Sequence, residues 1–217
     1  SFLSGVAQGT ERLSVMTSAG GLVPHDAFRA RDSLLSGPAG GVVGALAAGQ
    51  RAGFEKLIAF DMGGTSTDVC RLESSGAALT FEHGIGDIRL LAPAVAVESV
   101  AAGGGSICYL DSQGRLAVGP QSAGAAPGPA CYGRGGPLTI TDVNLLLGRI
   151  DPNTFSVPIN VSAAELAADT LVAQSGIADR NELLNGLLAL ADEAMADAIR
   201  QISVRQGVDP TAYALVA

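Results

Sequence analysis

Between two apolar segments the chain reads Asp61-Met62-Gly63-Gly64-Thr65-Ser66-Thr67-Asp68, and the fold can be worked out from this octapeptide. The segment before it, Lys56 to Phe60, and the segment that ends it, Thr67 to Leu72, have the length and apolar composition of β-strands. Because two adjacent glycines favour a tight turn, the two segments are predicted to form a hairpin with a loop rich in Gly, Thr and Ser.

The loop of this hairpin contains the groups that a phosphate and a magnesium ion require. Glycines let backbone amides approach a ligand closely, and hydroxyl groups are further donors to phosphate oxygens. The candidate phosphate ligands are Gly63, Gly64, Thr65, Ser66 and Thr67. Asp61 and Asp68 bracket the turn with carboxylates, which suit Mg²⁺ and are candidate catalytic groups as well as metal ligands. Spacing alone leaves an ordinary polar, glycine-rich hairpin equally open.

The remainder of the chain is predicted to be rich in strands first and in helices later. Further strands are expected at residues 13–16, 78–82, 87–91, 95–100, 106–110, 115–118 and 213–216. Helices are expected at residues 24–30, 42–52, 142–147, 162–175 and 179–206. This order predicts an α/β layered domain. No linker divides it, so a single domain is expected over residues 1–217, β-rich to about 140, helical to about 212, with a terminal strand at 213–217.

Local signals set the expected boundaries of the helices. Residues 36–41, Ser-Gly-Pro-Ala-Gly-Gly, predict a tight loop before the helix at 42–52. Thr141 is the expected cap of the next helix, and Ser162 with Glu165 forms a capping box. The buried face of the last helix is predicted to contain Leu183, Leu187, Leu190, Ala194, Ala198 and Ile202.

Composition excludes several classes of protein. With 21 acidic and 13 basic residues the formal charge is −8, which argues against a general surface for nucleic acids or anionic membranes. Three separated cysteines and two histidines predict neither a disulfide framework nor a structural zinc site. No run approaches the ~20 apolar residues of a membrane span, so a cytoplasmic protein is expected.

The chain lacks an initiator Met and stops in an apolar run, which suggests an internal piece of a longer protein.

The octapeptide resembles the phosphate loops of the actin, sugar kinase and Hsp70 superfamily of ATPases. Further strings occur in the order found in the hydantoinase A and 5-oxoprolinase family. They are Met16-Thr17-Ser18-Ala19-Gly20-Gly21, Ser36-Gly37-Pro38-Ala39-Gly40-Gly41-Val42-Val43-Gly44-Ala45, Val100-Ala101-Ala102-Gly103-Gly104-Gly105-Ser106-Ile107, Val118-Gly119-Pro120-Gln121-Ser122-Ala123-Gly124-Ala125, Pro127-Gly128-Pro129-Ala130-Cys131-Tyr132-Gly133 and Thr141-Asp142-Val143-Asn144-Leu145-Leu146-Leu147-Gly148-Arg149. Each string alone is weak, but the ordered set covers the chain almost end to end.

This resemblance implies an RNase H-like, actin-like ATPase half with a mixed sheet and flanking helices. It implies ATP and Mg²⁺ as cofactors, with two phosphate loops in the family, of which the loop at 61–68 resembles the second. The implied reaction is ATP-dependent opening of a small cyclic amide, such as a hydantoin or 5-oxoproline, by phosphorylation of the amide carbonyl oxygen. Because the opposing loop lies outside this chain, the fragment alone is expected to be inactive.

Several other residues are candidates with two interpretations each. The segment Gly103-Gly104-Gly105-Ser106 can present amides to the nucleotide or permit close packing of strands. Glu98 stands where many relatives have a histidine, which leaves its role open. Asp142 and Cys131 are better explained as structural than as catalytic residues. No role is assigned to His25 or His83.

Two other functions remain open from the sequence. The chain is also similar to subunits of ATP-dependent ketone carboxylases, in which phosphoryl transfer activates an enol or bicarbonate. Alternatively, it is mainly a docking module that binds a hydantoinase B-type subunit or domain through the irregular region 121–137. An isolated ATP-binding fold with kinase or chaperone activity agrees least with the hydantoinase-like strings.

Overall fold

The computed structural model describes residues 2–10, 12–85, 88–155 and 157–217. They form two compact units, each built from segments that are separated along the chain. Unit 1 comprises Ser1–Asp61, Asp68–Glu98 and Ile199–Ala217, and unit 2 comprises Met62–Thr67 and Ser99–Ala198. This division differs from the single domain expected over 1–217, because contacts between distant segments define it and no local change in composition marks it.

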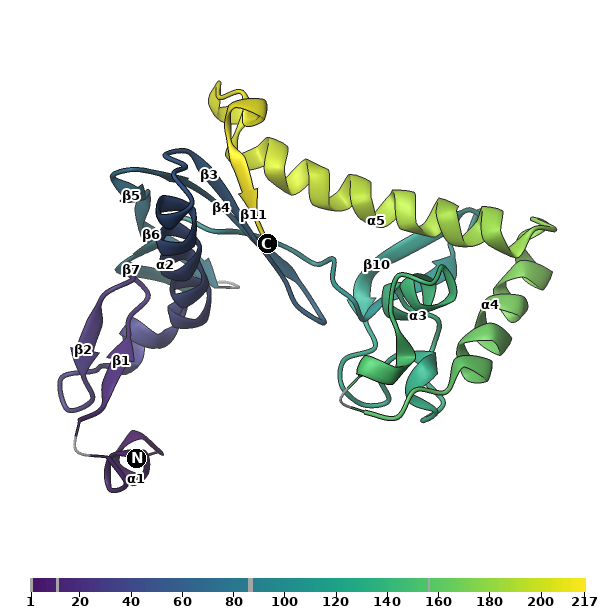
Figure 1. Cartoon of the computed structure of the whole chain (residues 1–217), viewed down its shortest axis with the longest axis horizontal. Coiled ribbons are helices and arrows are strands. Elements are labelled where there is room, and N and C mark those ends of the chain that lie inside the picture. Colours follow the sequence, from purple (N-terminus) through teal and green to yellow (C-terminus); the bar gives the residue numbers. More distant parts are fainter. Residues whose placement is uncertain (1, 11, 86–87, 156) are drawn as a thin grey trace. The chain divides into compact units, whose positions relative to one another are not determined.

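Unit 1 contains a mixed sheet with the strand order β11-β3-β4-β5 (Figure 1). The bounds are Leu57–Met62 for β3, Thr67–Glu73 for β4, Gly76–Ala77 for β5 and Ala214–Val216 for β11. The last strand runs parallel to β3, whereas β4 and β5 are antiparallel. β8 (Glu98–Val100) also pairs with β4. The predicted hairpin strands and the terminal strand are therefore confirmed, and the sheet is mixed as expected.

The helix α2 (Ser36–Arg51) packs on this sheet, and its buried residues Ala39 and Val42 share a core with Leu57 and Leu72. The expectation of a tight loop at 36–41 is wrong, because the glycines there belong to the helix. Small residues allow the helix to approach the sheet closely. A Cβ atom at Gly49, for example, would overlap the side chain of Leu57. Close packing outweighs the low helix propensity of glycine.

The remaining elements of unit 1 are two pairs of strands, one short helix and three 3₁₀ turns. They are α1 (Phe2–Ala7), β1 (Ser14–Met16), β2 (Leu22–Pro24), β6 (Leu79–Ile85), β7 (Ile88–Val95) and the 3₁₀ turns Ala30–Ser33, Val204–Gln206 and Pro210–Ala212. β1 pairs with β2 and β6 with β7, both antiparallel. The helix expected at 24–30 is wrong, since Pro24 ends β2 by pairing with Ser14. Asp87, the expected first residue of one strand, lies outside the described residues.

Unit 2 has the hairpin of β9 (Ser106–Leu110) and β10 (Leu116–Ser122), covered by helices. The helices are α3 (Ile140–Leu146), α4 (Val161–Ser175) and α5 (Arg180–Ile202), and 3₁₀ turns lie at Ala130–Tyr132 and Pro152–Thr154. Leu183, Leu187, Ala198 and Ile202 are buried as expected, whereas Leu190 is exposed and Ala194 is half-buried. Leu184, Leu188 and Ala191 are buried as well, so the buried face of α5 is broader than the predicted one.

Three predicted helix boundaries need correction. Thr139, not Thr141, is the N-cap of α3, and Asp142 closes a capping box with it. Asn160, not Ser162, caps α4, because its side chain accepts a hydrogen bond from the amide of Ala163. The final helix ends at Ile202 rather than Gln206, where a 3₁₀ turn follows. None of the helices formed by the described residues has the length and hydropathy that a membrane span needs.

Candidate phosphate turn and carboxylate pocket

The predicted phosphate turn, Met62–Thr67, is part of unit 2. The amide of Gly63 donates a hydrogen bond of 2.9 Å to the carbonyl oxygen of Ser66, which closes the turn between β3 and β4. Gly63, Gly64 and Thr65 are exposed. Neither glycine has a positive φ angle, so the turn does not need glycine for its backbone conformation. Glycine instead leaves positions 63 and 64 of this turn without a side chain.

The segment Gly103–Gly105 holds the turn from the inner side. The amide of Gly104 donates to the carbonyl oxygen of Gly63 (3.1 Å), and the amide of Gly105 donates to that of Gly64 (2.7 Å). A Cβ atom at Gly103 would lie 2.8 Å from the carbonyl oxygen of Gly63, and one at Gly105 would lie 2.8 Å from that of Gly64. Gly103 and Gly105 are therefore required for close backbone packing.

These two hydrogen bonds determine where the turn's own amides point. In a planar trans peptide the C=O and N–H groups point in opposite directions, and the bonds at Gly63 and Gly64 are trans. Since both carbonyls point toward Gly103–Gly105, the N–H groups of Gly64 and Thr65 point away from that segment. Within the described part of the chain, neither of these amides donates to a protein acceptor. Successive free amides of this kind form an anion-binding surface.

The hydroxyl groups near the turn divide into two kinds. Thr67 is fully buried, and its Oγ1 donates a 2.6 Å hydrogen bond to the carbonyl oxygen of Ala102. Ser106 is also buried, and its Oγ accepts a hydrogen bond from the amide of Gly103. Thr65 is exposed and Ser66 is half-buried, so their hydroxyls are the ones that a ligand on the outer side can reach.

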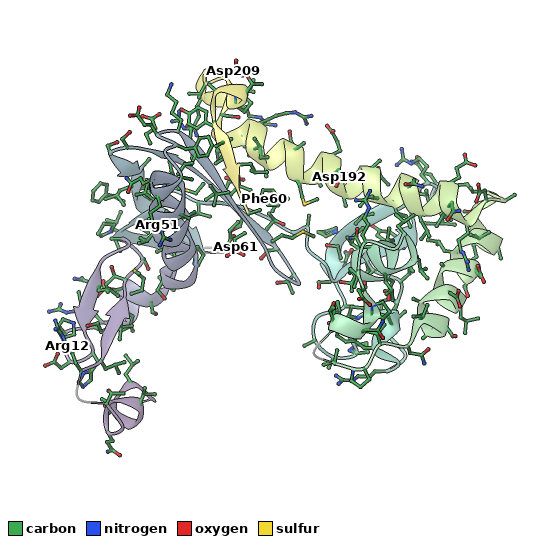
Figure 2. All side chains as sticks on the ribbon, viewed as in Figure 1. Arg12, Arg51, Phe60, Asp61, Asp192 and Asp209 are labelled. Atoms are coloured by element: carbon green, nitrogen blue, oxygen red, sulfur yellow. The ribbon has the colours of Figure 1, made fainter. Side chains whose placement is uncertain are left out.

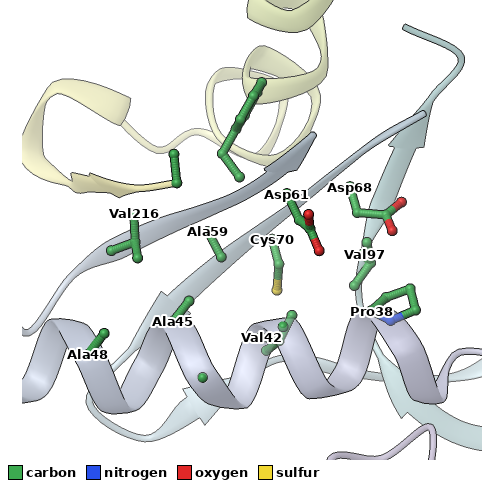
Figure 3. Close-up of a pocket in the computed structure, with 14 residues that line it drawn as sticks. Pro38, Val42, Ala45, Ala48, Ala59, Asp61, Asp68, Cys70, Val97 and Val216 are labelled. Carbon is green, nitrogen blue, oxygen red and sulfur yellow. The ribbon is translucent and has the colours of Figure 1, made fainter. Parts of the chain in front are cut away.

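Asp61 and Asp68 belong to unit 1, where both line a pocket of about 270 Å³ between the sheet and α2 (Figure 3). Asp61 follows Phe60 on β3 (Figure 2), and both carboxylates lie at one end of the pocket. The pocket walls are otherwise mostly apolar and are formed by residues such as Val42, Ala45 and Val216.

A glycine of α2 makes room for one of these carboxylates. A Cβ atom at Gly41 would lie 3.3 Å from Oδ2 of Asp61, so a larger residue there would crowd it. Two carboxylates with adjoining space suit a magnesium ion that takes its remaining ligands from water and phosphate. Among the described residues there is no group of three or more His, Cys, Asp or Glu side chains that could hold a metal by itself.

Asp142 is a structural residue, as the sequence analysis favoured. Its buried carboxylate accepts hydrogen bonds from the amides of Ala130, Cys131 and Thr139 and from the Thr139 hydroxyl, at 2.7–3.1 Å. It thus joins the region 121–137 to the start of α3. Cys131 is buried beside it, and burial together with the Asp142 carboxylate raises the pKa of the Cys131 thiol to about 12. Such a thiol is a poor nucleophile at neutral pH.

Sequence reasoning missed how the two glycine segments are connected. The turn at 63–66 and the segment at 103–105 are separated by about forty residues, yet they share backbone hydrogen bonds. It also missed Gly41 beside Asp61. The only signal in the sequence for either feature was the density of glycine in residues 36–44 and 103–105.

Comparison with solved structures defines the class of the fold. The nucleotide-free structure of an acetone carboxylase, described as ATP-dependent, superimposes with a TM-score of 0.86 at 27% sequence identity, over 98% of this chain and 32% of that one. The ATP-dependent caprolactamase of Pseudomonas jessenii gives a TM-score of 0.83 at 33% identity, over 99% of this chain and 33% of that one. The chain therefore has the ATPase-like α/β fold of these two enzymes.

The family follows from sequence comparison. The family model described as hydantoinase/oxoprolinase matches residues 4–217, so the chain belongs to the hydantoinase/oxoprolinase family. It is 43% identical over 231 residues to a 5-oxoprolinase of Pestalotiopsis fici, which covers all of this chain but 18% of that protein. It is also 37% identical over 206 residues to caprolactamase subunit alpha of Pseudomonas jessenii, covering 92% of this chain and 30% of the subunit. The chain thus spans less than a third of these relatives.

Proposed function

We propose that this chain supplies a phosphate-binding turn and a magnesium-binding carboxylate pair to an ATP-dependent enzyme that opens cyclic amides. The observation that carries the proposal is the pair of N–H groups of Gly64 and Thr65, which point outward from a turn held by Gly104 and Gly105. Phosphate oxygens accept hydrogen bonds from such backbone amides. Since the turn is already held by the protein, little reorganisation is needed when an anion binds.

Each residue of the turn has a distinct part in this proposal. The amides of Gly64 and Thr65 and the hydroxyls of Thr65 and Ser66 donate to phosphate oxygens, while Gly63 keeps the approach open. Asp61 and Asp68 are the magnesium ligands and orient the reacting groups. Residues Thr67 and Gly103–Ser106, which were candidates for direct contact, act on the nucleotide by holding the turn, since their amides and hydroxyls are used within the protein.

Bound ATP would supply a phosphoryl group that activates an otherwise unreactive amide carbonyl toward water. The names of the relatives support an amide substrate. One is a 5-oxoprolinase and another a caprolactamase, and both names denote enzymes that act on lactams. A small cyclic amide is therefore the substrate class that we propose for the complete protein.

A ketone carboxylase is the second candidate, and the structural similarity to an acetone carboxylase favours it. The two functions share the ATP-binding part and differ in the acceptor of the phosphoryl group. Complete protein would be assayed for ATP hydrolysis with hydantoin, 5-oxoproline, caprolactam, and acetone with bicarbonate. We expect one of the cyclic amides to stimulate hydrolysis, and stimulation by acetone with bicarbonate alone would establish the carboxylase instead.

A partner subunit is also part of the proposal, because the related caprolactamase chain is named a subunit. We propose a hydantoinase B-type subunit or domain as the partner. The region 121–137 is the candidate docking surface, and its two longer exposed stretches are Gly124–Pro127 and Gly133–Gly135, whereas Ala130 and Cys131 are buried. If replacing both stretches leaves copurification of the partner unchanged, this surface is excluded.

The test of the ATP site is Asp61→Ala in the complete protein, with Asp192→Ala as the matched control. Asp192 is an exposed residue of α5, so its loss removes the same charge away from the pocket. We expect Asp61→Ala to lower substrate-stimulated ATP hydrolysis at least about 100-fold, as is usual when an electrostatic catalytic group is removed. Hydrolysis at the wild-type rate would refute the proposed role of Asp61.

A further inference from the structure

Thr141 makes an unusual double contact with the segment that supports the turn. Its backbone amide (2.8 Å) and its side-chain Oγ1 (2.9 Å) both donate to the carbonyl oxygen of Gly104. A Cβ atom at Gly104 would lie 2.9 Å from Oγ1 of Thr141, so this glycine is needed for the contact. Thr141 therefore determines the position of the peptide group between Gly104 and Gly105.

The same peptide group contacts the phosphate turn on its other side. The carbonyl of Gly104 and the N–H of Gly105 belong to one peptide group, and that N–H donates to the carbonyl oxygen of Gly64, in the peptide group whose N–H belongs to Thr65. A continuous path of hydrogen bonds thus runs from Thr141 through the Gly104–Gly105 peptide group to the Gly64–Thr65 peptide group. Any rotation of the first peptide group would rotate the second and change the direction of the Thr65 N–H.

The start of this path is firmly held. Thr141 lies in the first turn of α3, and the residues on either side of it, Ile140 and Asp142, are buried. The capping box of Thr139 and Asp142 fixes the same helical turn. The side chain of Thr141 thus connects the buried first turn of α3, through hydrogen bonds, to the exposed turn Gly63–Ser66.

We propose that Thr141 is a positioning residue for the nucleotide phosphates, which rests on the proposed function of the Gly63–Ser66 turn. Its hydroxyl acts through the Gly104–Gly105 peptide group and orients the N–H of Thr65 toward the bound phosphate. The backbone amide of Thr141 still holds Gly104 when the hydroxyl is removed. Loss of the hydroxyl therefore makes the orientation of the turn less fixed, while the hydrogen bond from the Thr141 amide to Gly104 remains.

The test compares three variants of the complete protein. Thr141→Val keeps the branched shape and removes the donor, while Thr141→Ser keeps the donor. Thr170→Val is the matched control, because the Thr170 Oγ1 donates to a backbone carbonyl of α4, that of Leu166, within the same unit. The KM for ATP, the KM for the cyclic amide, kcat and the melting temperature are measured for each.

We expect Thr141→Val to raise the KM for ATP about tenfold, corresponding to loss of one well-oriented donor to a charged group. The KM for the cyclic amide stays within about twofold, and the melting temperature falls by no more than about 4 °C. Thr141→Ser and Thr170→Val retain the wild-type KM for ATP. If Thr141→Val does not fold, Thr141→Ala is measured in its place with the same expectation.

Two results would overturn this inference. One is a KM for ATP within twofold of the wild type in the valine or alanine variant, and the other is an equal rise of both KM values. Gly64→Ala separates this failure from that of the proposed function. If Gly64→Ala raises the KM for ATP but Thr141→Val does not, only the role of Thr141 is refuted. If neither changes it, the turn does not bind phosphate and both proposals fail.

Discussion

The two glycine segments of unit 2 contain the same residue type for opposite reasons. Gly63 and Gly64 form an exposed turn in which an added Cβ atom would meet at most the carbonyl oxygen of Ser66, at 3.5 Å, and at Gly64 nothing within 4 Å. In Gly103–Gly105 every added Cβ atom would lie within 3 Å of another atom. The first segment leaves room for a ligand, whereas the second allows two segments of the backbone to pack closely against each other.

The contrast also shows which segment can bind a ligand. The amides of Gly103, Gly104 and Gly105 all donate to acceptors within the protein. Those of Gly64 and Thr65 donate to none among the described residues. A glycine-rich sequence therefore indicates that something packs closely against the backbone. The hydrogen bonds of the backbone amides show whether that neighbour is a ligand or another segment of the protein.

The largest effect on stability is expected for Gly103→Ala. Its Cβ atom would lie 2.8–2.9 Å from backbone atoms of Gly63, Gly64 and Ser66, which cannot move as a flexible side chain would. We expect a loss of about 3 kcal/mol in the free energy of unfolding, measured by urea denaturation. Gly40→Ala in α2 is the control, since a Cβ atom there meets nothing and alanine favours the helix. Equal stability of the two variants would contradict the packing role.

A smaller loss, about 2 kcal/mol, is expected for Asp142→Asn. The substitution keeps the shape but turns one acceptor oxygen into a donor, in a buried site where all four neighbouring groups are donors. Urea denaturation measures the change. Asp151→Asn is the control, because Asp151 is an exposed cap of a 3₁₀ turn. If Asp142→Asn is no less stable than its control, the buried carboxylate does not hold α3 in place.

The smallest effect on stability is expected for Gly64→Ala, within about 0.5 kcal/mol of the wild type, because the new methyl group extends into open space. The same group would lie where a phosphate approaches, so the KM for ATP should rise about tenfold or more. Parallel measurement of unfolding and of ATP hydrolysis tests both statements. A stable variant with an unchanged KM would show that the outer side of the turn is not a ligand site.

Much of the fold could be predicted from the sequence, because its signals are local. The strand from Leu57, the strand from Thr67 and the hairpin at Ser106–Val118 follow from apolar runs and turn residues that lie next to one another. Helix α5 follows from leucines at three- and four-residue steps. The cap of α3 was predicted at Thr141 but lies at Thr139, because the contacts of the two side chains decide which of them caps the helix.

The candidate site was predicted as a set of residue types but not as an arrangement. From the sequence, Gly63 and Gly103 were both candidates for binding the nucleotide, because both lie in glycine-rich loops after strands. Their contact depends on the path of the chain between them, and no local pattern encodes that path. The same holds for Gly41, whose importance follows only from the nearby Asp61 carboxylate.

The sequence by itself determined that the chain has a strand–turn–strand with carboxylates at both ends of the turn, and that it resembles the hydantoinase/oxoprolinase family. Both depend on residues adjacent in the chain or on the order of short strings. The tertiary structure alone decided that Gly104 and Gly105 orient the amides of the turn and that Thr141 holds Gly104. The direction of a peptide group depends on the acceptors and donors around it, and these come from segments far apart in the sequence.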